Sequence, residues 1–201
     1  MSQANTPAFL DKKYNIIYAD PPWSYKDKKC NGNAAQHYNL MKDSDICALP
    51  VGYIPKAAGS SGRGQGMGFT YKTIGFQWIK ENKSENGHFF GLGRWTRGNT
   101  EPCLIGTKGD LFPVVLNEEA SAPCLIATKG KPQRISAIVG QLIFSPIGAH
   151  SQKPDEVRDR IVELMGDLLR IELFARSGAD GWDCWGNEAP TQKQEDESWM
   201  L

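Results

Sequence analysis

The sequence predicts an α/β domain, and three observations lead to that prediction. Short apolar runs rich in β-favouring residues recur along the chain, one amphipathic helix stands out among them, and the length allows a single sizeable core. Of the 201 residues, 40% are hydrophobic and 23% are charged, as in an ordinary globular protein. We expect a single domain over residues 1–188 and a polar, disordered tail over residues 189–201.

The first strand is expected at Tyr14–Ala19, an apolar run that ends at Asp20. Asp43–Leu49 predicts a short helix, and the Gly/Ser-rich composition of residues 52–68 predicts a flexible linker. Later runs of the same apolar, β-favouring kind predict strands at Phe69–Lys80, Pro102–Thr107, Pro123–Thr128, Gln141–Ser145, Ile171–Ala175 and Trp182–Trp185.

The clearest helix is expected over Pro154–Leu168. Pro154 suits the first helical position, and Asp155 and Glu156 favour the positive N-terminal end of a helix. The apolar residues recur at helical spacing, so one face of this helix should pack on the sheet. That face consists of Val157, Ile161, Leu164, Met165 and Leu168.

Charge and cysteine usage exclude several classes of protein. Lysine plus arginine equal aspartate plus glutamate at 23 each, so a nucleic-acid substrate would need a local basic surface. No apolar run approaches the ~20 residues of a membrane span, and the N-terminus has no apolar signal region. The five cysteines show no CxxC spacing and the three histidines share no metal-ligand spacing. We therefore expect a reduced, cytoplasmic protein without a metal site.

Asp20-Pro21-Pro22-Trp23 has the groups that methylation of an exocyclic amine, such as N6 of adenine, requires. The N6 amine of adenine is a poor nucleophile because its lone pair is delocalised into the ring. A carboxylate and a backbone carbonyl that accept its two hydrogens would localise the lone pair, and Asp20 and Pro21 can supply them. Two prolines stiffen the carbonyl direction, and Trp23 offers a flat face for a flipped base. The alternative is a plain turn beside a core tryptophan.

Four blocks in order resemble the MT-A70 adenine methyltransferases. The blocks are Tyr18–Trp23, Trp95–Gly109, His150–Glu156, and Ile171–Arg176 followed by Gly181–Glu188. The resemblance implies a Rossmann-like fold that depends on S-adenosylmethionine. Its motif order is permuted, and its mixed, mostly parallel sheet is flanked by helices. The short chain is most similar to the phage and bacterial members that modify DNA.

The resemblance also implies roles at matching positions. Asp20, Pro21, Pro22 and Trp23 would form the catalytic motif that binds the target amine. Asp20 would also lie near the amino group of S-adenosylmethionine, and Lys153 would pair with its carboxylate. Phe174 and Arg176 would flank the cofactor, and Asn187 and Glu188 would bind its ribose hydroxyls. A lysine before a helix and an arginine in a surface ion pair are the plain alternatives for Lys153 and Arg176.

DNA is the expected partner, with the target adenine as substrate, and a homodimer stays open. Lys26, Arg94 and Arg97 are candidates for substrate contacts, because Lys26 follows the motif and the arginines lie within or directly before a matching block. Solvated loop residues are the alternative.

The chain departs from the family in its middle. Residues 52–68 stand where members usually have an apolar strand and helix, and residues 110–123 form an insertion. The insertion separates two copies of one segment, Pro102–Gly109 and Pro123–Gly130, which match at seven of eight positions. We hypothesise that the run Leu111–Leu116 replaces the lost strand, although Pro113 favours an edge or a bulge. Two other functions stay open: an inert binding module and an RNA adenine methyltransferase.

Overall fold

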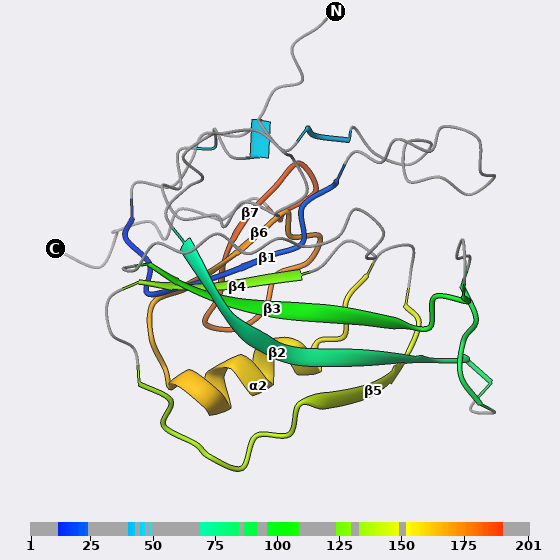
Figure 1. The fold of residues 1–201 in the computed structure, drawn as a ribbon. Helices are drawn as coiled ribbons and strands as arrows, with labels where there is room; N and C mark the ends of the chain where they lie inside the picture. The colour runs from blue at the N-terminus through cyan, green and yellow to red at the C-terminus, as the bar shows by residue number, and fades with distance from the viewer. Residues whose placement is uncertain are drawn as a thin grey trace, which may run out of the picture.

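The computed structural model describes residues 12–23, 40–42, 45–46, 49, 69–84, 87–91, 96–108, 124–129, 133–148 and 152–190. Seven strands and one long helix lie within these ranges (Figure 1). They are β1 (Ile16–Ala19), β2 (Phe69–Glu81), β3 (Thr100–Lys108), β4 (Cys124–Lys129), β5 (Leu142–Pro146), α2 (Glu156–Met165), β6 (Arg170–Leu173) and β7 (Asp183–Trp185).

Each strand that the sequence predicts is confirmed, with ends that differ by one or two residues. The helix is shorter than predicted, because it begins at Glu156 and Gly166 ends it with a positive φ of 85°. Asp45 and Ile46 lie in a helical turn, where the Ile46 amide donates to the Lys42 carbonyl. The predicted linker at 52–68, the insertion at 110–123 and residues 191–201 of the predicted tail lie outside the described residues.

The strands form one mixed sheet in the order β5-β2-β3-β4-β1-β6-β7. Four neighbouring pairs are parallel, namely β2–β5, β3–β4, β1–β6 and β6–β7. The other two, β1–β4 and β2–β3, are antiparallel. The expected mixed and mostly parallel sheet is therefore confirmed. The strand with the Asp-Pro-Pro motif also lies beside β6, which comes near the end of the chain, as the permuted order implies.

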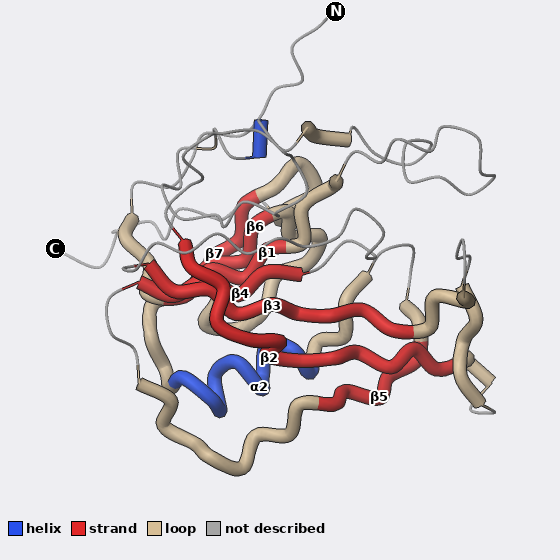
Figure 2. The backbone as a smooth tube through the Cα atoms, in the orientation of Figure 1, coloured by secondary structure: helices blue, strands red, loops and turns tan. Residues whose placement is uncertain are grey.

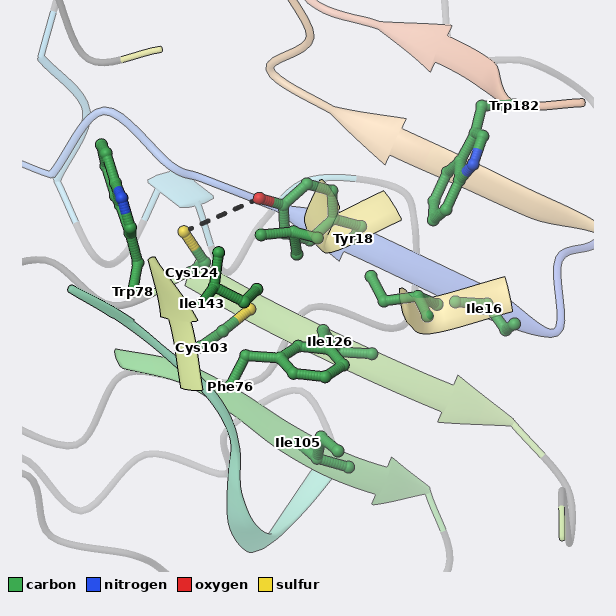
Figure 3. Packing of buried hydrophobic residues seen from close by; sticks show 12 residues of the cluster. Ile16, Tyr18, Phe76, Trp78, Cys103, Ile105, Cys124, Ile126, Ile143 and Trp182 are labelled. Carbon is green, nitrogen blue, oxygen red and sulfur yellow. Dashed lines mark hydrogen bonds between the residues drawn. The ribbon is translucent and has the colours of Figure 1, made fainter. Parts of the chain in front are cut away.

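Two apolar clusters cover the two faces of the sheet. On one face, where α2 lies across the sheet (Figure 2), Val157 and Ile161 pack against buried residues of the five strands β1 to β5. Among these residues are Ile16, Tyr18 and Ile143 (Figure 3). Leu164, Met165 and Leu168 complete the predicted apolar face of the helix, and they pack against the same cluster. On the other face the sheet packs against Trp23 and Ile46. No helix among the described residues is long and apolar enough to cross a membrane.

The two copies of the repeated segment lie side by side as β3 and β4. They pair in parallel with equivalent residues in register, from Cys103 opposite Cys124 to Lys108 opposite Lys129. β4 then pairs with β1, so the second copy is the strand that stands next to the strand with the Asp-Pro-Pro motif. The hypothesis that Leu111–Leu116 replaces a lost strand concerns residues outside the described ranges; in the described sheet, the place beside β1 belongs to β4.

Because Ile126 of β4 is 1% exposed and packs among the residues on the α2 face, we predict that Ile126→Ala destabilises the protein strongly. The expected loss in the free energy of unfolding is about 2–5 kcal/mol, since the substitution leaves a cavity in the core. Urea denaturation of both proteins measures it. Leu142→Ala is the matched control, because Leu142 is 48% exposed on β5. Equal, small losses for both variants would mean that the second copy is not seated in the sheet.

Candidate active site

The ends of several strands meet at one edge of the sheet, and the functional side chains gather there. The carboxyl ends of the parallel strands β1, β6 and β7 lie at this edge (Figure 1). β4 runs antiparallel to β1 and β3 runs parallel to β4, so their amino-terminal ends reach the same edge. Ligands in α/β sheets bind beyond such strand ends. The fold therefore brings together residues from segments far apart in the sequence.

A chain of alternating charges runs along this edge. Lys153 Nζ lies 3.0 Å from Asp20 Oδ2 and 2.7 Å from Glu101 Oε2. Lys80 Nζ donates to Glu101 Oε1 at 2.5 Å, and the ammonium lies 5.3 Å from the centre of the Trp78 ring. The side chains of the four charged residues are 13–22% exposed, so their attraction is only weakly screened by solvent.

The pKa values of these groups follow from burial and from their neighbours. Burial and the Glu101 carboxylate raise the pKa of Asp20, which Lys153 and Arg176 lower only in part, so that it stays above its ordinary value. Burial would also raise the pKa of Glu101, but Lys153 and Lys80 outweigh it and lower that pKa. Burial would lower the pKa of Lys153, yet Asp20, Cys124 and Glu101 raise it well above its ordinary value. Lys153 thus stays charged between two acids.

The backbone after Asp20 makes a tight turn. The Trp23 amide donates to the Pro21 carbonyl at 2.8 Å, and the Met41 amide donates to the Pro22 carbonyl at 2.8 Å. A carbonyl oxygen has two lone pairs, so that of Pro21 can accept one further hydrogen bond. Trp23 is only 7% exposed and packs in the core cluster on the face of the sheet opposite α2. Its ring is therefore covered, as in the alternative of a core tryptophan.

The turn after β6 is strained and closely packed. Phe174 has a φ of 62°, a left-handed conformation that is rare for a large side chain. Its ring lies edge-on to Trp185, with 5.6 Å between the ring centres. Gly186 leaves room for this turn, because a Cβ there would come within 2.9 Å of the Phe174 Cα. Packing between the ends of β6 and β7 thus holds Phe174 at the edge where Asp20 lies.

Three further predicted residues lie beside Phe174. Arg176 and Glu188 form a long ion pair, with 3.9 Å between Nε and Oε2. Asn187 precedes Glu188, and all three residues are exposed. Arg176 lowers the pKa of Asp20, which is consistent with one continuous site along the edge. All the predicted cofactor residues therefore come from strand ends at this edge or from the loops that follow them.

The substrate candidates and the residues that sequence reasoning missed complete the site. Arg97 is exposed in the loop between β2 and β3, while Lys26 and Arg94 lie outside the described residues. Glu101 and Lys80 were not expected in the site, because nothing in the local sequence shows that Lys153 will lie between two acids. In the described part of the chain, no group of three or more His, Cys, Asp or Glu residues is arranged to hold a metal ion.

The chain is similar to known adenine methyltransferases. The MT-A70 family model matches residues 68–188. The chain is 30% identical to the Type II methyltransferase M.MunI of Mycoplasma sp., over 94% of this chain and 83% of the relative. It is 26% identical to the N(6)-adenosine-methyltransferase MT-A70-like protein of Drosophila melanogaster and 24% identical to the N(6)-adenine-specific methyltransferase METTL4 of Mus musculus. These two alignments cover 90% and 88% of this chain but only 28% and 38% of the relatives.

We predict that Lys153→Met destabilises the protein by about 3–5 kcal/mol at neutral pH, because two buried carboxylates lose their shared ammonium. In the variant the pKa values of both acids rise in the folded state. The folded protein then binds more protons than the unfolded chain, so the variant regains stability as the pH falls toward 5.

Urea denaturation at several pH values measures this effect. Lys12→Met is the control, because Lys12 pairs with Asp183 and its side chain is 48% exposed. A surface pair of that kind contributes only about 0–1 kcal/mol. If Lys153→Met lost no more stability than the control, or if its loss were independent of pH, Lys153 would not be what stabilises the carboxylates of Asp20 and Glu101.

Proposed function

This chain belongs to the MT-A70 family, and on that premise we propose that it transfers a methyl group from S-adenosylmethionine to the N6 amine of adenine in DNA. The proposal rests on one observation above all: Asp20 of the Asp-Pro-Pro-Trp motif lies 3.0 Å from Lys153, at the edge where the strand ends meet. A carboxylate and an ammonium are thus placed together beside the backbone carbonyl of Pro21.

The residues at this edge fit S-adenosylmethionine by their chemistry. The cofactor carries an ammonium, a carboxylate and ribose hydroxyls, and the site offers a partner for each. Asp20 would hold the ammonium and Lys153 the carboxylate, while Asn187 and Glu188 would bind the hydroxyls. Phe174 and Arg176 would flank the bound molecule. The exposed Arg176–Glu188 pair, at 3.9 Å, is loose enough to open for a ligand.

S-adenosylmethionine supplies, when bound, a methyl group on a positively charged sulfur. The protein prepares the amine for attack: Asp20 accepts one N6 hydrogen and the free lone pair of the Pro21 carbonyl accepts the other. These two acceptors localise the nitrogen lone pair, and the Asp20 carboxylate stabilises the positive charge that develops on the nitrogen. Catalysis therefore comes from position and charge, without a covalent bond to the enzyme.

The position of Trp23 adds a condition to this mechanism. Because Trp23 is 7% exposed, a flipped base can stack on its ring only after the neighbouring side chains move. We propose that adenine entry opens the face of Trp23, which the turn at Pro21 and Pro22 keeps next to Asp20. Pro22 contributes through this turn.

DNA is favoured over RNA by the pattern of similarity. The chain covers most of a Type II methyltransferase, whereas it covers about a quarter to two fifths of the adenosine and METTL4 relatives. The resemblance to the short DNA-modifying members agrees with this pattern. RNA is the second candidate, because several relatives are named N(6)-adenosine-methyltransferases.

We propose further that the chain forms one domain over residues 1–188 and acts in the cytoplasm.

We predict that Asp20→Ala folds but loses most methyl transfer, by about 10²-fold or more in kcat, because both the acceptor and the charge at the amine are removed. The assay is radiolabelled transfer from S-adenosylmethionine to unmethylated genomic DNA and to RNA, with digestion to nucleosides. Asp167→Ala is the control, since Asp167 is 89% exposed and pairs with Arg170 at the start of β6, away from the strand ends that hold Asp20. Near-normal label in N6-methyladenine with Asp20→Ala would refute the assignment, and label in RNA alone would move it to the second candidate.

Arg97→Ala should weaken DNA binding with little effect on the chemical step. Arg97 is exposed in the loop that joins β2 to β3, and it would contact a phosphate. Loss of one such contact lowers the slope of log K against log salt by about 1. Binding to a labelled duplex at several salt concentrations measures the slope, with Arg134→Ala as the exposed control. An unchanged slope would remove Arg97 from the binding surface.

A further inference from the structure

The two copies of the duplicated segment, β3 and β4, both begin at the active site. They differ in the residue two positions before the shared cysteine. The parallel register that places Cys103 opposite Cys124 brings both amino-terminal ends to the edge that holds Asp20 and Lys153. The residue two positions before the cysteine is Glu101 in the first copy and Ala122 in the second. The copies match at seven of eight positions within the segment, so the acid just before it is a feature of the first copy alone.

We propose that the duplicated strand is part of the reaction site, with its two copies holding the two members of the Asp20–Lys153 pair. Glu101, at the start of β3, holds Lys153, and Cys124, at the start of β4, holds Asp20. Both are positioning residues, since each acts through the residue that it contacts. This proposal rests on the proposed function, which gives Asp20 and Lys153 their roles.

The first half of the proposal stands on the contacts of Glu101. Its Oε2 lies 2.7 Å from Lys153 Nζ, and its Oε1 accepts from Lys80 at 2.5 Å. Lys80 therefore anchors the carboxylate from β2 while Lys153 is held at its other oxygen. Lys153 lies in the loop before α2, so neither a strand nor a helix fixes its backbone. Glu101 supplies a second fixed point for its ammonium.

The second half stands on the contacts of Cys124. Its thiol donates a long, weak hydrogen bond to Asp20 Oδ1 at 3.9 Å. It also accepts one from the Tyr18 hydroxyl at 3.9 Å, the bond that Figure 3 shows as a dashed line. Oδ1 thereby has a partner on β4 while Oδ2 faces Lys153. A carboxylate with a partner on each oxygen has one preferred orientation. Burial, a hydrogen bond with Cys103 and the charge of Asp20 keep the pKa of the Cys124 thiol well above its ordinary value, so the thiol stays protonated.

A small cavity shows how closely these groups converge. It measures about 10 Å³, close to the smallest space that holds one water molecule. Cysteines of both copies line it together with Glu101, Lys153 and Tyr18. Cys103 and Cys124 are each 4% exposed and lie in the same cluster. The duplication thus provides a matched pair of cysteines, of which Cys124 is the one with the contact to Asp20.

The pKa of Asp20 tests the role of Glu101. It should shift in opposite directions in a Glu101 variant, according to whether Glu101 holds Lys153 or only adds a negative charge. The charged and titratable groups around Asp20 are Lys153, Glu101, Cys124, Tyr18, Glu172 and Arg176. The Glu101 carboxylate itself raises the pKa of Asp20. If Lys153 stayed in place, Glu101→Gln would lower that pKa. If Glu101 holds Lys153, the variant releases the ammonium from Asp20 and the pKa rises.

The deciding experiment follows the Asp20 carboxyl carbon by ¹³C NMR in wild type and Glu101→Gln, beside the pH profile of kcat/KM. We expect a higher Asp20 pKa, an acid limb moved to higher pH, and about 10²-fold lower kcat/KM at neutral pH. Glu172→Gln is the matched control, since it also removes a buried acid from an ion pair, and it should lower the pKa or leave it unchanged. A lower or unchanged Asp20 pKa in Glu101→Gln would overturn the role of Glu101.

A second cysteine variant tests the other half. Cys124→Ala should lower kcat several-fold with KM for S-adenosylmethionine nearly unchanged. Cys184→Ala should keep kcat, because the buried Cys184 thiol of β7 hydrogen-bonds to the carbonyls of Ser177 and Trp182. Equal effects on kcat, or none for Cys124→Ala, would overturn the role of Cys124. The NMR titration needs no turnover. If wild type transferred no methyl group while the Asp20 pKa rose in Glu101→Gln, the proposed function would fail and the role of Glu101 would stand.

Discussion

The structure depends on one buried interaction, the contact of Lys153 with two carboxylates. Asp20 and Glu101 come from different strands, and without a cation between them two partly buried negative charges would repel each other. The contact therefore ties the end of β1, the start of β3 and the loop before α2 together at one point. In the proposed function, it also places the Asp20 carboxylate where the target amine needs an acceptor. Under that proposal, the ion pairs that stabilise the edge of the sheet also orient the Asp20 carboxylate.

The order of strands explains how these ion pairs can form although the middle of the sequence departs from the family pattern. The strand beside β1 is the second copy of a segment whose first copy lies immediately beyond it, in parallel register. Equivalent residues of the copies face the same sides, so Ile105 and Ile126 both fill the cluster under α2, while Leu104 and Leu125 fill the other. A duplicated strand thus supplies core packing for which its sequence is already suited. The buried apolar residues on both sides of β4 show that the described sheet keeps a packed core beside β1.

Much of the fold could be predicted because its signals are local. The strands are apolar runs bounded by polar residues, and the helix has an acidic first turn and a regular apolar face, so periodicity suffices for both. Asp20, Lys153, Phe174 and Arg176 could be placed through the motifs that surround them. Glu101, Lys80 and Cys124 could not, because their importance comes from pairing between strands. The burial of Trp23 was also beyond the motif, since it depends on Ile46 and on strands from other parts of the chain.

In the proposed function, S-adenosylmethionine binds at the edge of the sheet around Asp20 and Lys153. Isothermal titration calorimetry of that cofactor tests it most directly, with wild type compared with Lys153→Met at a pH where both are folded. We expect one molecule to bind per wild-type chain and at least about tenfold weaker binding to the variant, since a charge-assisted contact is lost. Equal affinities would contradict it, and the charge chain would then be a stabilising feature of the fold alone.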